Sequence, residues 1–155
     1  MIGMLLVTLI STSGVLASLT QEAGGRVATT NPFVGHWVAD VSQSRFDNKM
    51  PITAADINIA VNGNIVKLAS SFTLPSGQTQ SETETLRADG TETAGTLTPG
   101  IIHVANWVGP RVLALIARKG DQNIALITYE VSADGQTLTA RTSGLVEQMM
   151  VFRRR

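Results

Sequence analysis

The residues that could do chemistry are few and widely spaced in this chain. The two histidines are His36 and His103, the single tyrosine is Tyr129, and Glu82 and Glu84 stand two residues apart. A histidine facing a tyrosine could work as an acid–base pair or hold the polar end of a ligand. Two histidines without a recurring spacing do not form a metal set, and the chain has no cysteine. The sequence therefore predicts no catalytic set, no metal site and no cofactor.

His103 is the most informative of these residues, because it lies in an apolar run, 101–108. It has the same parity as Trp107, meaning that an even number of positions separates them, so in a strand their side chains point to the same face. Tyr129 shares its parity with Ile127, so we expect it to point inward as well. A barrel brings non-adjacent strands face to face across its interior. We therefore predict that His103, Trp107 and Tyr129 bind a ligand; a core histidine and a core tyrosine with satisfied hydrogen bonds are the alternatives.

The other polar candidates have simpler interpretations. Glu82 and Glu84 share one face of a segment, 79–86, that is rich in Thr, Ser and Gln. Paired carboxylates can divide acid and base roles, but these neighbours indicate a solvated strand face. His36 precedes Trp37, so it faces outward if Trp37 faces inward. We interpret all three as exposed residues.

The elements that would position these residues are short strands between turns. Dipeptides such as Asn62-Gly63, Asp89-Gly90 and Asp134-Gly135 suit hairpin turns. Turn signals recur every nine to fifteen residues or so, about one strand apart. The apolar period between turns is two, and the best helical candidate is a short turn over 41–45. We predict an all-β fold, a single antiparallel meander closed into a barrel of about eight or nine strands.

Two runs, 101–108 and 111–117, are apolar on both faces. Strands of this kind are covered on both sides. The barrel interior would cover one side, and another element or a second subunit would cover the other. A homo-oligomer is therefore one of the assemblies that the sequence allows.

Composition indicates one small domain and excludes one class of partner. The 155 residues are 43% hydrophobic but 5% aromatic, and 12 basic residues balance 12 acidic ones. Proteins that bind nucleic acid normally carry a basic stripe, whereas the basic run here is confined to 153–155. Nucleic acid is not an expected partner. The aliphatic bias favours an oily cavity with one or two polar groups.

The N-terminal residues have the pattern of a leader. Residues 4–10 form a short apolar run, and Val15-Leu16-Ala17 provides small-residue cleavage chemistry before Ser18. Hydroxyl residues and Gly14 dilute this segment below a stable membrane span. We expect a signal peptide over 1–17, a flexible tether over 18–30 and one domain over 31–155. The expected location is periplasmic or extracellular.

An ordered set of motifs resembles exported bacterial lipocalin-like (calycin-like) domains. The set comprises NPFVGHWVAD at 31–40, SQSRF at 42–46, YEVSADGQTLT at 129–139 and MMVF at 149–152. The resemblance extends over nearly all of 31–152 and implies a lipocalin-like barrel that is exported. Members of this group are mostly of unestablished activity, so the resemblance implies a fold more than a function.

The resemblance also implies structural roles. In lipocalins the tryptophan of Gly-x-Trp lies at the closed end of the barrel and packs against a basic residue of the last strand. Gly35 and Trp37 match the first part of this pattern, and Arg153 or Arg154 matches the second. A guanidinium over an indole face is favourable for either arginine, and of the two we predict Arg153 as the partner.

Three functions are compatible with this sequence. The first is an exported barrel that binds a small apolar ligand and has no established reaction, and it is the one we predict. The second is a cyclase- or isomerase-type enzyme that uses His103 and Tyr129. The third is an oligomeric interaction module built on 101–108 and 111–117. Whether the protein is an enzyme is left open, with ligand binding alone preferred.

Overall fold

The computed structural model describes residues 30–47, 51–96 and 98–155. The predicted signal peptide and the predicted tether up to residue 29 lie outside these described residues. Within them, no helix has the length and apolar character needed to cross a membrane. The boundaries predicted for leader, tether and domain stay predictions.

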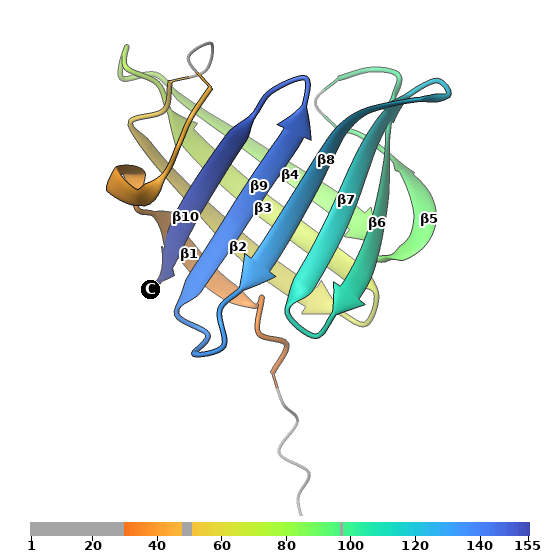
Figure 1. The fold of residues 1–155 in the computed structure, drawn as a ribbon, viewed down its shortest axis with the longest axis horizontal. Helices are drawn as coiled ribbons and strands as arrows, with labels where there is room; N and C mark the ends of the chain where they lie inside the picture. The colour runs from red at the N-terminus through yellow and green to blue at the C-terminus, as the bar shows by residue number, and fades with distance from the viewer. Residues whose placement is uncertain (1–29, 48–50, 97) are drawn as a thin grey trace, which may run out of the picture.

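Ten strands make up the described chain (Figure 1). A 3₁₀ helix, η1 (Val41–Gln43), follows the first strand, at the short turn predicted over 41–45. The strands are β1 (Gly35–Ala39), β2 (Ala54–Asn62), β3 (Ile65–Thr73), β4 (Thr79–Arg87), β5 (Asp89–Ala94), β6 (Ile101–Gly109), β7 (Val112–Lys119), β8 (Gln122–Val131), β9 (Thr137–Gly144) and β10 (Gln148–Arg154). The predicted all-β antiparallel meander is confirmed, with slightly more strands than expected.

The sheet is a nearly closed barrel. Its strand order is β4-β3-β2-β1-β10-β9-β8-β7-β6-β5, so the first and last strands of the chain pair with each other. The two ends of the order, β4 and β5, are consecutive in the chain. Figure 1 shows β2, β3 and β4 crossing behind the strands of the C-terminal half. Each interior strand is therefore paired on both edges, which removes edges that an open sheet would expose.

Alternation along the strands builds the interior. In β2 the side chains of Ala55, Ile57 and Ile59 are buried and their neighbours are not. In β7 the same is true of Leu113 and Leu115. A strand places successive side chains on opposite faces, so these residues line the inside of the barrel.

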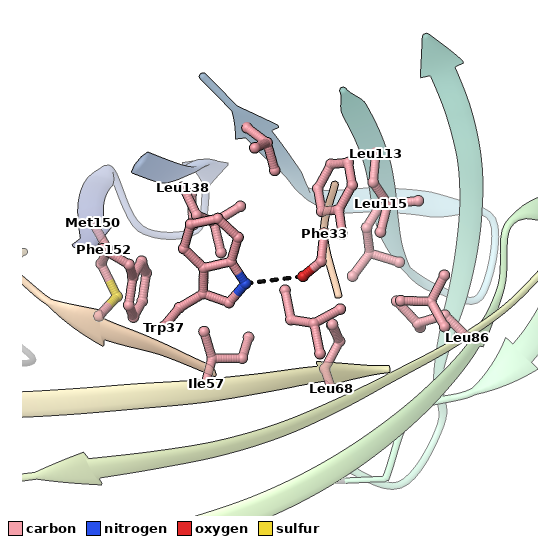
Figure 2. Close-up of a cluster of buried hydrophobic side chains, with 14 of the residues drawn as sticks. Phe33, Trp37, Ile57, Leu68, Leu86, Leu113, Leu115, Leu138, Met150 and Phe152 are labelled. Atoms are coloured by element: carbon pink, nitrogen blue, oxygen red, sulfur yellow. Dashed lines mark hydrogen bonds between the residues drawn. The ribbon is translucent and has the colours of Figure 1, made fainter. Parts of the chain in front are cut away.

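Phe33 and Trp37 pack among aliphatic side chains in a buried cluster inside the barrel (Figure 2). Phe33 and Trp37 are fully buried, and Trp37 Nε1 donates a hydrogen bond to the Phe33 carbonyl oxygen at 2.9 Å. The Phe33 ring packs on Trp107, with ring centroids 5.1 Å apart. Trp107 stands near the turn between β6 and β7, so this end of the barrel is closed by packed side chains.

The partner of Trp37 is Arg154, and the prediction of Arg153 was wrong. The Arg154 guanidinium carbon lies 4.1 Å from the centroid of the Trp37 ring. Phe152 is buried, and Arg154 shares its parity, whereas Arg153 faces outward, 3.5 Å from an Asp40 carboxylate oxygen. Because side chains alternate along β10, Arg154 points to the inner face of the barrel and Arg153 to the outer face.

The contact between Arg154 and Trp37 also explains why position 35 is a glycine. Its φ is +142°, a region that favours glycine. A Cβ at position 35 would lie 2.7 Å from Nη1 of Arg154. Gly35 thus leaves room for the guanidinium to reach the face of Trp37.

The outer faces of β6 and β7 are partly covered. Val104 and Ile116 are half-buried by neighbours within the sheet, whereas Val108 is 69% exposed and Leu126 of β8 is 45% exposed. Within the described residues, these outward side chains are therefore partly to largely exposed. A second subunit over this face stays a prediction.

Candidate ligand-binding cavity

The other end of the barrel holds a cavity of about 290 Å³. Val146 and Gln148, at the turn between β9 and β10, lie at this end, away from the aromatic residues of the closed end. A volume near 300 Å³ is at the lower limit of small-molecule sites. Most of the wall is apolar, and its members include Ile57, Phe72, Leu115, Ile127, Met150 and Phe152.

Five larger polar side chains face this apolar space. Glu82 and Glu84 come from β4, His103 from β6, Tyr129 from β8 and Gln148 from β10. Each shares the inward parity of its strand; Leu86, for example, is fully buried two residues after Glu84. The barrel thus gathers polar groups from four strands around one cavity.

Glu84 and His103 form the closest polar contact of the cavity. Glu84 Oε1 meets His103 Nδ1 in an ion-pair contact, and the two side chains are only 18% and 14% exposed. Neither of these two buried atoms has a hydrogen bond to another partner among the described residues. The contact joins β4 to β6 at the place where the strand order of the sheet ends.

The imidazole of His103 also lies close to Gly95. A Cβ at position 95 would lie 3.2 Å from His103 Cε1 and 3.4 Å from Nε2. Gly95 therefore makes room for the ring beside the end of β5. The His103 ring therefore lies between Glu84 and Gly95.

The cavity alters the acidity of two of its members. Burial raises the pKa of Tyr129 above its usual value, and the Glu84 and Glu82 carboxylates raise it further. Tyr129 is therefore a neutral phenol that can donate a hydrogen bond at neutral pH. Burial also raises the pKa of Glu82, and the charge of Glu84 adds to the effect, while His103 opposes it.

The structure brings together two of the three predicted ligand-binding residues. His103 and Tyr129 both point inward and line the same cavity. Trp107 also has inward parity, but it lies at the closed end against Phe33 and is not among the residues that line this cavity. Trp107 lies four positions after His103 in the same strand, a distance of about 13 Å. Ligand binding by these residues stays a prediction.

The interpretation of Glu82 and Glu84 as a solvated face was wrong. Their strand is polar, but both side chains point into the barrel. The sequence signal for this was Leu86, an apolar residue on the same face of the strand as the two glutamates. Gln148 was also missed, although it shares its parity with Met150 and Phe152. His36 is exposed as predicted, with its Nε2 atom 3.4 Å from an Asp56 carboxylate oxygen.

Replacing Glu82 with glutamine is expected to stabilise the protein at neutral pH. Because the folded-state pKa of Glu82 is raised above 4.5, folding favours its protonated form. That stability is present below about pH 4.5 and is lost as the pH rises through the folded-state pKa. Thermal melts should show a higher Tm for Glu82→Gln than for wild type near pH 7, and no gain at acidic pH. Asp121→Asn, which neutralises an exposed turn carboxylate, is the control. A rise in the Tm of Glu82→Gln that is the same at all pH values would show that the raised pKa of Glu82 is not its cause.

No protein-family model matches this chain. No curated protein matches it either. Among the described residues, no group of three or more His, Cys, Asp or Glu side chains is arranged to hold a metal ion.

Solved structures share the fold of this chain. The fluorescent protein UnaG superposes with a TM-score of 0.59 and 18% identity, over 79% of this chain and 97% of that one. The REP1-NXSQ fatty acid transporter gives 0.53 and 16%, over 79% and 95%. A Schistosoma mansoni fatty acid binding protein in complex with arachidonic acid gives 0.55 and 14%, over 80% and 96%. The chain therefore has a calycin-like fold of the fatty-acid-binding-protein type, and at these identities the likeness shows the fold alone.

Proposed function

We propose that this protein binds a small, mainly apolar molecule inside its barrel. The observation that carries the proposal is the cavity, whose apolar wall surrounds a few converging polar side chains. This is the usual composition of small-molecule sites. Neighbours in fold whose names state fatty acid binding or transport support the same proposal. The ligand's apolar part would lie along Ile127, Met150 and Phe152, and its polar end near His103 and Tyr129.

A cavity-filling variant tests this proposal. Nile red, a neutral hydrophobic dye, is titrated with the wild type and with Ala140→Phe, which places a ring in the cavity from β9. We expect the dye's affinity to fall at least tenfold, about 1.4 kcal/mol. Ala60→Phe, on the exposed face of β2, is the matched control and should bind like the wild type.

Thr142→Phe, nearer the turn between β9 and β10, serves if Ala140→Phe loses its β-sheet signal in circular dichroism. Dye binding that is unchanged in folded variants at both cavity positions would place the dye outside the barrel and contradict the proposal.

Acid–base catalysis on the bound molecule is the second candidate function. The contact between Glu84 and His103 favours it, because a carboxylate that fixes an imidazole prepares it for proton transfer, and Tyr129 lines the same cavity. Molecules that co-purify with the protein would be identified by mass spectrometry and incubated with it. Turnover that His103→Gln abolishes, with dye binding retained, would establish the enzyme; an unchanged ligand would contradict it.

We also propose that the chain is exported, as its leader pattern and its resemblance to exported bacterial domains suggest. Sequencing the N-terminus of protein from the exported fraction should give a start near Ser18. An intact Met1 on protein that stays in the cytoplasm would contradict export.

A further inference from the structure

The polar lining of the cavity is acidic and rich in acceptors. It contains the carboxylates of Glu82 and Glu84 and the amide of Gln148, and no lysine or arginine of the described chain belongs to it. The one basic group that the described residues place there is His103, which is already in contact with Glu84. Within this part of the chain, the cavity therefore lacks a free cation that could receive an anionic ligand.

The net charge of the ionised lining is negative whichever form His103 takes. If the imidazole is protonated, its charge is matched by Glu84 and the carboxylate of Glu82 remains. If the imidazole is neutral, both carboxylates remain. The lining thus has an excess of negative charge whenever the two glutamates are ionised. Tyr129 adds no charge, because its raised pKa keeps the phenol neutral.

A second observation concerns hydrogen bonding. Gln148 Oε1 is buried and has no hydrogen-bond partner within the described part of the chain. Buried acceptors are normally paired, because an unpaired one loses its water without compensation. A donor group on the ligand would supply the missing partner, and a ligand end with several N–H groups could serve Gln148 and a carboxylate together.

We propose that the polar end of the ligand is a cation that carries N–H donors, as in a protonated alkylamine, and that Glu82 is its counter-ion. This inference rests on the proposed function, and it narrows the ligand to a chemical class. Burial and repulsion by Glu84 raise the pKa of Glu82, so a cation bound there relieves an unfavourable charge. A carboxylate-ended molecule would instead place a third negative charge beside the two glutamates.

The test compares three ligands with the same chain, n-octylamine, n-octanol and octanoate, by calorimetry and by Nile red displacement near pH 8. At this pH the amine is charged and octanoate is ionised. We expect octylamine to bind at least about tenfold more tightly than octanoate, with octanol between them. Glu82→Gln should reduce the preference for octylamine at least severalfold and leave octanol affinity unchanged, and Asp121→Asn should change neither.

The outcomes separate the two proposals. If octanol and the dye bind in the cavity but octylamine binds no better than octanoate, the cationic ligand is excluded and the proposed function stands. A preference for octylamine that survives in folded Glu82→Gln protein overturns the assignment of Glu82. If neither the dye nor any of the three ligands binds, both proposals fail. Ligand-induced rises in Tm provide an independent readout of each affinity.

Discussion

Replacing Trp37 with alanine is expected to lower the free energy of unfolding by about 3–5 kcal/mol, the usual range for removing a large buried aromatic side chain. Trp37 is fully buried. The substitution also leaves the Phe33 carbonyl oxygen without its donor and removes the surface on which the Arg154 guanidinium stacks. Denaturation in urea, followed by circular dichroism, measures the loss.

Trp107→Ala is the comparison for this prediction. Its ring packs on Phe33 at the same end of the barrel but is only partly buried, so a smaller loss is expected. Because Trp107 lies apart from the cavity lining, Nile red affinity should be retained. Equal losses in the free energy of unfolding of the two variants would contradict the prediction that Trp37 contributes more to stability than Trp107.

Much of the fold follows from local signals in the sequence. β2 ends at Asn62 and β3 begins at Ile65. Gly63, the first residue of the two-residue turn between them, has a φ of +58°, which suits a tight hairpin turn. Alternating residues such as Ile57 and Ile59 then give the strand and its inner face. The count of strands was less predictable, because β4 and β5 are separated by Ala88 alone and are read easily as one polar segment.

The site was predictable only in part. The alternation of side chains places His103 and Tyr129 inside the barrel, but it gives no position along the barrel axis. It therefore could not show that Trp107 packs against Phe33, away from the cavity that His103 and Tyr129 line. The Glu84–His103 contact joins β4 to β6, which do not pair with each other. Such a contact depends on how the sheet curves and closes, which is not encoded in the residues of either strand alone.

Polar composition was a misleading guide for β4. Thr, Ser, Gln and Glu over 79–85 suggest contact with water, but both glutamates of this segment face a cavity instead. A cavity relaxes the rule that inward residues are apolar, since its surface can be matched by a ligand or by water. The departure from the expected pattern is itself a signal of function, because polar residues at interior positions are costly without a partner.

Arg154→Ala is expected to lower the free energy of unfolding by about 3 kcal/mol, since charged hydrogen bonds contribute more than neutral ones. The Arg154 guanidinium donates to three carbonyl oxygens, those of Gly135 at 2.7 Å, Val34 at 2.8 Å and Pro32 at 2.5 Å. It also lies over the Trp37 ring. One side chain thus connects the turn before β9 and the segment before β1 to the last strand.

Arg153→Ala is the matched control, because it removes the same side chain from the opposite face of β10. Arg153 is exposed and pairs with Asp40 at 3.5 Å, and such surface pairs contribute about 0–1 kcal/mol. Arg154→Lys should recover only part of the loss, since an ammonium group lacks the planar fork that reaches several carbonyls at once. Urea denaturation of the three variants measures these differences. Losses of equal size at positions 153 and 154 would contradict the inward parity of Arg154 in β10 and, with it, the closure of the barrel around Trp37.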